Sequence, residues 1–123
     1  MLFRSLDLNG AGAGTSVTLN YTENGAATSI APAALTSDLD SADYSGGSLT
    51  VAFTANGTTA DQLTINNQGV GAGQIGVSVS TITFGGATIG TFSGGTNGTS
   101  LVISFTTANA TPAAVQALLQ NIQ

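Results

Sequence analysis

Apolar residues recur at every second position in several short runs of this sequence. A period of two places one face of a β-strand in a core and leaves the other face in solvent. Glycine and asparagine separate the runs, and the Gly85-Gly86 pair favours a tight hairpin turn. We therefore predict strands at residues 16–22, 48–54, 63–65, 75–79, 81–84, 87–92 and 101–106.

The end of the chain has a different period. Val115, Leu118 and Leu119 have the spacing of one apolar stripe on an amphipathic helix. The residue before this region is a threonine, which is a good N-cap, and the next is a proline, which suits the first helical position. The sequence therefore predicts a helix over residues 112–121.

Short strands with a turn every 8–12 residues are typical of a β-sandwich of the immunoglobulin-like kind, with Greek-key connections. The predicted fold class is therefore all-β, with a short C-terminal helix. Helices within such sandwiches normally lead into another strand, so we expect a truncated domain that lacks its final strand or strands. Residues 1–14 are predicted to be a linker with a non-native start, and residues 15–123 the sandwich.

Charged residues make up 6% of the chain, against roughly 25% in an average soluble domain. The net charge is −5, and Arg4 is the single basic residue. Binding to nucleic acid or to an anionic membrane surface depends on Lys and Arg. No apolar run approaches the roughly 20 residues of a membrane span. We therefore predict neither nucleic-acid partners nor membrane insertion.

Histidine and cysteine are absent from the chain. Their absence removes the commonest general base and the thiolate nucleophile. Paired carboxylates can hydrolyse glycosidic bonds, but the chain has no Trp to form a platform for a sugar. No base is available to activate Ser or Thr. We predict that the protein is not an enzyme.

Three of the six acidic residues, Asp38, Asp40 and Asp43, fall within residues 37–44. Two unit charges about 4 Å apart cost roughly 4 kcal/mol at an intermediate dielectric. Calcium removes this repulsion, because it takes about 6–8 oxygen ligands from carboxylates, carbonyls and water. A solvated turn is the alternative interpretation, since Asp and Ser are favoured turn residues.

Two other groups of oxygen ligands are predicted to lie near this acidic stretch. Glu23 follows the first predicted strand, and Asp7 and Asn9 lie in the predicted linker. A sandwich would place that strand end near the linker and the acidic stretch. We expect five of the six acidic residues to meet at this end, with Asp61 elsewhere.

Nearly the whole chain resembles the bacterial cadherin-like tandem repeats of giant secreted surface proteins, which occur beside RTX-type calcium repeats in adhesins. The family repeats continue past the helix into another strand and an Asp-Gly-Asp-Gly connector, which this sequence lacks. The segments that carry the resemblance are residues 7–14, 22–24, 37–43, 61–63, 67–77 and 110–119.

The resemblance implies a calcium-stiffened adhesion repeat at the bacterial cell surface or in a secreted protein. Its partners would be neighbouring repeats of the same chain and host-surface or matrix ligands. The calcium ligands that it implies are a glutamate at the end of the first strand (Glu23), a pair in the connector between repeats (Asp7 and Asn9) and a pair in a loop (Asp38 and Asp40). The predicted calcium ligands are Glu23, Asp38, Asp40, Asp43, Asp7 and Asn9.

Two other functions stay open. A self-assembling fibre subunit would borrow its missing strand from a neighbour. A glycan-binding sandwich would carry exposed aromatic side chains on one face. The chain has only two Tyr and five Phe, and most of them fall at inward strand positions, which argues against the second alternative.

Overall fold

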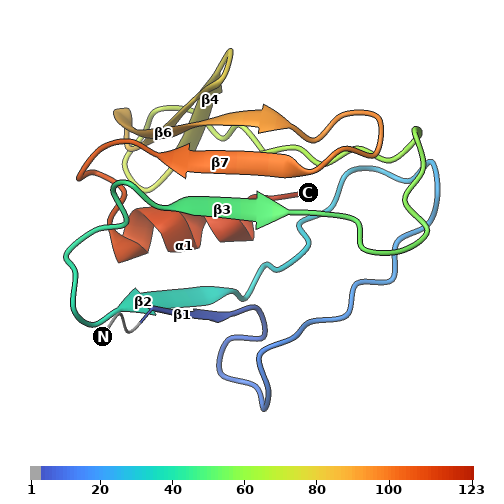
Figure 1. Ribbon diagram of the computed structural model, residues 1–123, viewed down its shortest axis with the longest axis horizontal. Helices are drawn as coiled ribbons and strands as arrows, with labels where there is room; N and C mark the ends of the chain where they lie inside the picture. Colours follow the sequence, from blue (N-terminus) through green and yellow to red (C-terminus); the bar gives the residue numbers. More distant parts are fainter. Residues whose placement is uncertain (1–3) are drawn as a thin grey trace.

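The computed structural model describes residues 4–123, which form seven strands and one helix (Figure 1). The first two strands are widely separated in sequence, and the last four follow one another closely before the helix. In chain order the elements are β1 (Arg4–Asp7), β2 (Leu35–Asp38), β3 (Ser48–Val51), β4 (Ile75–Ser78), β5 (Thr81–Phe84), β6 (Ala87–Gly94), β7 (Leu101–Phe105) and α1 (Pro112–Gln120).

The strands form two antiparallel sheets. The larger sheet has the order β3-β7-β6-β5-β4, and the smaller one pairs β1 with β2. Helix α1 lies between the two sheets and packs against β2 and β4 (Figure 1). The fold is therefore mostly β, as predicted, with one short C-terminal helix between its layers.

The core forms where α1 meets the larger sheet. Ala114, Val115, Leu118 and Leu119 are buried along one face of the helix, so the predicted apolar stripe is confirmed. The predicted N-cap is also confirmed, because Thr111 Oγ1 accepts a hydrogen bond from the Ala114 N–H at 3.3 Å. The sheet contributes Ile75, Ile82, Ile89, Leu101 and Ile103, all with no exposed surface.

Strand β7 follows the predicted alternation. Leu101, Ile103 and Phe105 are buried, whereas Val102 and Ser104 are exposed. The predicted hairpin between β5 and β6 is also present. Its turn residues have positive φ angles of 58° at Gly85 and 84° at Gly86, which is the conformation that a two-residue hairpin turn requires.

The structure corrects two of the predicted strands, shortens three others and extends β6 to Gly94. Strand β7 ends at Phe105, one residue before its predicted end. Residues 16–22 form no strand, and residues 63–65 contribute only an isolated bridge between Ile65 and Ile122. Strand β3 ends at Val51, and β4 ends before Val79, whose φ of 56° places it in the following turn. Alternation specifies the two faces of a strand, but a strand also needs a backbone partner.

Part of the predicted linker is paired. Residues 4–7 form β1 and pair with β2, in a register that sets Arg4 opposite Asp38 and Asp7 opposite Leu35. The first three residues, which belong to the predicted non-native start, lie outside the described residues. Residues 8–14, the rest of the predicted linker, form a loop that is closed by a hydrogen bond from the Leu8 N–H to the Thr15 carbonyl oxygen, at 3.0 Å.

The position of α1 generates a prediction about stability. Leu118→Ala should lower the free energy of unfolding by about 2–5 kcal/mol, because it opens a cavity between the helix and the sheets. Val102→Ala, on the solvent face of β7, should lower it by less than about 1 kcal/mol. Urea denaturation of both variants measures the difference, and equal losses would contradict this placement of the core.

Candidate functional site

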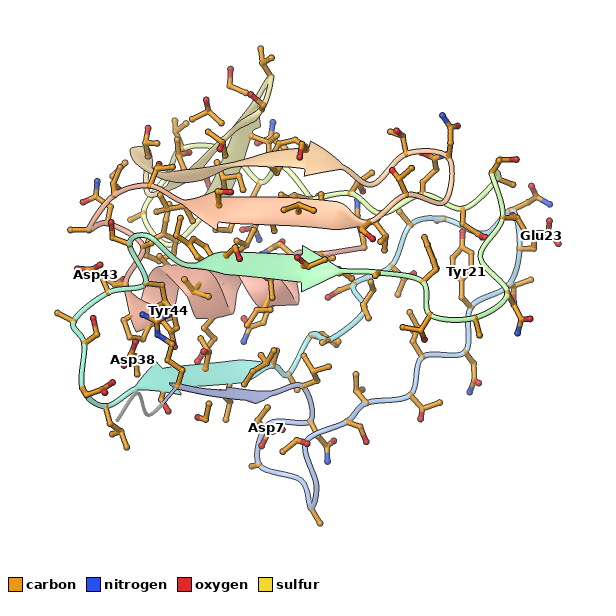
Figure 2. All side chains as sticks on the ribbon, in the orientation of Figure 1. Asp7, Tyr21, Glu23, Asp38, Asp43 and Tyr44 are labelled. Atoms are coloured by element: carbon orange, nitrogen blue, oxygen red, sulfur yellow. The ribbon has the colours of Figure 1, made fainter. Side chains whose placement is uncertain are left out.

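The predicted loop ligands lie on the connection between the two sheets. We call residues 38–43 the acidic turn. It begins at Asp38, the last residue of β2, and the chain then passes through residues 44–47 into β3. Figure 2 shows Asp38, Asp43 and Tyr44 together at one end of the molecule. The acidic turn is therefore part of the covalent link from the smaller sheet to the larger one.

Asp38 is held by two hydrogen bonds at the start of the acidic turn. Its Oδ2 accepts a hydrogen bond from Arg4 Nε at 2.9 Å, and this contact is also an ion pair. Its Oδ1 accepts a hydrogen bond from the Ser41 N–H at 3.1 Å. The Asp38 side chain has no exposed surface, whereas that of Arg4 is 38% exposed. The pair thus fixes the turn to the first strand of the smaller sheet.

Opposing effects act on the pKa of Asp38. Desolvation of its carboxylate raises the pKa, but interactions with the side chain and backbone of Asp40 and with the Arg4 guanidinium lower it. The lowering effects prevail, so the pKa of Asp38 lies below its ordinary value of 3.8. Asp38 is therefore a carboxylate at neutral pH.

Tyr44 holds the other end of the connection. Its ring is buried, its hydroxyl lies 2.7 Å from Thr36 Oγ1, and its N–H donates to the Ala110 carbonyl oxygen at 2.9 Å. The Arg4 guanidinium carbon lies 5.4 Å from the centroid of the Tyr44 ring, which is within the range of a cation–π contact. The ring also contacts Phe105, with 6.2 Å between the centroids. Tyr44 thus connects both sheets to the helix N-terminal region.

The other two carboxylates of the acidic turn differ in exposure. Asp43 is half-buried, and its Oδ1 accepts a hydrogen bond from the Ser45 N–H at 2.8 Å. Asp40 is exposed and interacts with Asp38. Ser41 Oγ donates to the Asp43 carbonyl oxygen at 2.8 Å. These local bonds are those of an ordered turn that carries three carboxylates.

The remaining predicted ligands lie elsewhere. Asp7 is at the far end of β1 from Arg4, where its Oδ1 accepts a hydrogen bond from the Asn9 N–H at 2.8 Å. Asn9 Nδ2 in turn donates to the Ala13 carbonyl oxygen at 2.8 Å. Glu23 lies at the opposite end of the molecule from Asp38 (Figure 2). The structure does not bring the six residues together, and within residues 4–123 no three acidic side chains are grouped so that they could hold a metal ion.

The structure contains a second feature that sequence reasoning missed. A hollow of about 430 Å³, which we call the aromatic hollow, lies at the end of the molecule that carries Glu23. Its lining includes Tyr21 and Phe53, which are 56% and 38% exposed, together with Glu23, Asp61 and Gln62. Phe53 lies within the strand predicted at residues 48–54, but β3 ends at Val51, so its ring is free of the strand.

Local bonds hold the rim of the aromatic hollow. The Tyr21 hydroxyl donates to the Gly25 carbonyl oxygen at 2.6 Å, which fixes the ring. Asp61 Oδ2 accepts hydrogen bonds from the Thr58 N–H at 2.6 Å and from Thr58 Oγ1 at 3.0 Å. Each aromatic ring is followed within four residues by an Asn-Gly pair. This spacing is the sequence signal that each ring lies at the end of an extended stretch, just before a turn.

Comparisons with known proteins identify no relative: no family model, curated protein or solved structure matches this chain. In the part of the chain that the structure describes, no helix has the length and apolarity needed to cross a membrane.

The lowered pKa of Asp38 predicts an acid-dependent loss of stability. The ion pair stabilises the fold above pH 3.8, the ordinary value for this group, and the contribution is lost as the pH falls through the lower folded-state pKa. The difference in unfolding free energy between wild type and Asp38→Asn should therefore shrink on acidification. Urea denaturation at a series of pH values measures it.

Replacement of the cation provides the control for this prediction. In Arg4→Gln the Asp38 carboxyl should titrate at a higher pH than in wild type, because one of the groups that lower its pKa is removed. Carbon-detected NMR follows the carboxyl signal directly. A wild-type Asp38 that titrates at or above 3.8 would contradict the assignment.

Proposed function

We propose that this chain is a calcium-binding structural adhesion repeat of a large bacterial cell-surface or secreted protein. The observation that carries the proposal is the location of the acidic turn. It holds three of the six acidic residues and forms part of the connection between the two sheets. An ion bound there would stiffen the joint between the sheets.

The charge balance of the acidic turn supports a cation from solution. Arg4 is the only basic residue of the chain, and it already pairs with Asp38. Further positive charge at Asp40 and Asp43 has to come from outside the chain. Calcium is suited to this role, because it binds carboxylate, carbonyl and hydroxyl oxygens in an irregular geometry.

The proposed ligand set is smaller than the one that the sequence predicts. It consists of Asp40 and Asp43, completed by backbone carbonyls and water. Asp38 is left out because Arg4 and the Ser41 N–H engage its two oxygens, and because no three acidic side chains in residues 4–123 are grouped to hold an ion. Glu23 is left out because it lies at the opposite end of the molecule (Figure 2). Asp7 and Asn9 are left out because they bond to each other and to the loop after β1.

The partners in this proposal are neighbouring repeats of the same chain and host-surface or matrix ligands. The support is the composition, which is poor in charge and rich in glycine, and the sequence resemblance to cadherin-like repeats of surface adhesins. Extracellular modules bind calcium with dissociation constants of about 10⁻⁴–10⁻³ M.

Calcium should raise the melting temperature of the protein. At ten times the dissociation constant, one site adds about 1.4 kcal/mol to the free energy of unfolding. For a domain of this size the shift is about 3–8 °C. Asp40→Asn should lose most of the shift, because it removes a charged ligand and keeps the shape. Thermal melts with calcium, with magnesium and with a chelator measure the effect.

Asp61→Asn is the matched control for Asp40→Asn. It removes the same charge, but Asp61 bonds to Thr58 outside the acidic turn. The control should therefore keep the calcium shift. Identical melting of wild type and Asp40→Asn in all three solutions would show that the acidic turn is only a solvated turn.

A second candidate function, glycan binding, is favoured by the aromatic hollow. Its volume of about 430 Å³ lies within the range of small-ligand sites, and it combines two aromatic rings with carboxylate and amide groups. Such rings stack on the apolar faces of sugars, and the polar groups accept hydrogen bonds from hydroxyls.

Binding to neutral oligosaccharides on an array tests this second candidate. Tyr21→Ala should abolish the signal, because it removes one ring of the aromatic hollow. Tyr44→Phe should leave the signal unchanged, because Tyr44 lies at the other end of the molecule (Figure 2). No binding to any glycan by the wild type would exclude this candidate.

A further inference from the structure

The outer strands of the two sheets face a common hollow. In residues 4–123, β1 pairs only with β2, and β3 pairs only with β7. A hollow of about 180 Å³ lies between β1 and β3, and we call it the seam. Its lining includes Leu6, Leu49, Phe105, Val115 and Leu119. The seam thus combines two open strand edges with an apolar floor, which is the arrangement that accepts an added strand.

The chain also contains a segment with strand character and no strand partner. Residues 16–22 alternate apolar Val17, Leu19 and Tyr21 with Ser, Thr and Asn. Residues 16–21 make no backbone–backbone hydrogen bond with another described residue. Leu19 and Tyr21 are 39% and 56% exposed. Residues 16–22 carry no charge, so they would bring no ionised side chain of their own into the seam.

We propose that the seam takes up residues 16–22 of a second copy of this chain as an added β-strand. This inference is independent of calcium binding and goes beyond the proposed function. The added strand would bond to the open edges of β1 and β3. Tyr21 would cover the apolar floor, and Leu19 and Val17 would continue along the same side past the end of β1. The polar residues between them would face the other side.

The direction of the strands sets the orientation of the added segment. Strands β1 and β3 run in the same direction. Strand β1 is antiparallel to β2, and the arrow of β3 points opposite to that of β2 in Figure 1. A segment antiparallel to β3 is then antiparallel to β1 as well. Its C-terminal end, which continues into Glu23, arrives at the end of the seam lined by Arg4. Arg4, which pairs with Asp38 through its Nε, would then also face the Glu23 carboxylate across the interface.

The orientation also gives a register. With Glu23 opposite Arg4, Thr22 lies opposite Ser5 and Tyr21 opposite Leu6. Arg4 lies over the ring of Tyr44, which also lines the seam, and Leu6 shares its face of β1 because strand residues two apart point the same way. In this register the side chains of Glu23 and Tyr21 point to that same side. The apolar alternation and the charge pairing therefore agree on one register.

The chain's own segment leads away from the seam. After Thr15, which is bonded to Leu8, the backbone runs toward the opposite end of the molecule, where Figure 2 places Tyr21 and Glu23. There the Tyr21 hydroxyl is bonded to Gly25. The seam and the segment of one molecule are thus apart, and two copies can exchange segments reciprocally.

Sedimentation of the full chain over roughly the micromolar-to-millimolar range tests the proposal. Wild type should form a dimer or larger assembly, more strongly at high salt, because screening weakens repulsion between two copies of net charge −5. Asn20→Pro should weaken association at least about tenfold, because the proposed register places Asn20 opposite Asp7 of β1, and proline removes a donor and disfavours pairing. Asn20→Ala, the matched control, should associate about as wild type does.

Both Asn20 variants should melt at the wild-type temperature under monomeric conditions, because Asn20 makes no backbone–backbone hydrogen bond with the described residues. This measurement separates an effect on association from an effect on folding. Equal association of Asn20→Pro and Asn20→Ala would overturn the proposal, as would a wild type that stays monomeric throughout the range.

Disulfide trapping tests the register, since the chain has no cysteine of its own. Ser5→Cys and Thr22→Cys, made in separate proteins and mixed under oxidising conditions, should give a crosslinked heterodimer, because opposed strand residues lie within disulfide distance. Ser5→Cys mixed with Thr64→Cys, which places the thiol by the aromatic hollow, should not. Equal crosslinking in both mixtures would place the contact elsewhere and overturn the proposed seam.

Discussion

Burial of one apolar helix face holds this structure together. Each sheet offers an apolar surface that it cannot cover alone, and α1 lies between them and covers both. Leu118, which has no exposed surface, lies on this helix face. The smaller sheet has only two strands, and isolated two-stranded sheets are marginal in water. Its position therefore depends on the helix and on the polar contacts around Tyr44.

Charge in this chain is concentrated where the backbone changes layer. Arg4 links β1 to Asp38 and stacks on Tyr44, so the single cation serves both the smaller sheet and the connection to the larger one. The aromatic hollow at the other end carries Glu23 and Asp61 without a basic residue. The two ends of the molecule therefore differ in chemistry: one combines three carboxylates with a cation, and the other combines carboxylates with exposed rings.

The predicted strands separate into those that have a neighbour close in sequence and those that do not. Strands β4, β5 and β6 follow one another through short turns, and the sequence located each of them. Residues 16–22 alternate as clearly as β7 does but have no partner strand, so they form none. Val79 continues the alternation of β4, yet it lies in the turn with 96% of its surface exposed. A period of two contains no information about where pairing stops.

The sequence by itself determined the local elements: the hairpin at Gly85-Gly86, the alternation of β7, the helix with its threonine cap, and the acidic stretch. Each depends on residues a few positions apart. Only the tertiary structure decided that residues 4–7 pair with residues 35–38, that α1 lies between the sheets, and that Glu23 is distant from Asp38. The physical reason is that backbone pairing across about thirty residues is selected by the packing of the whole core, whereas turn and helix preferences act within a few residues.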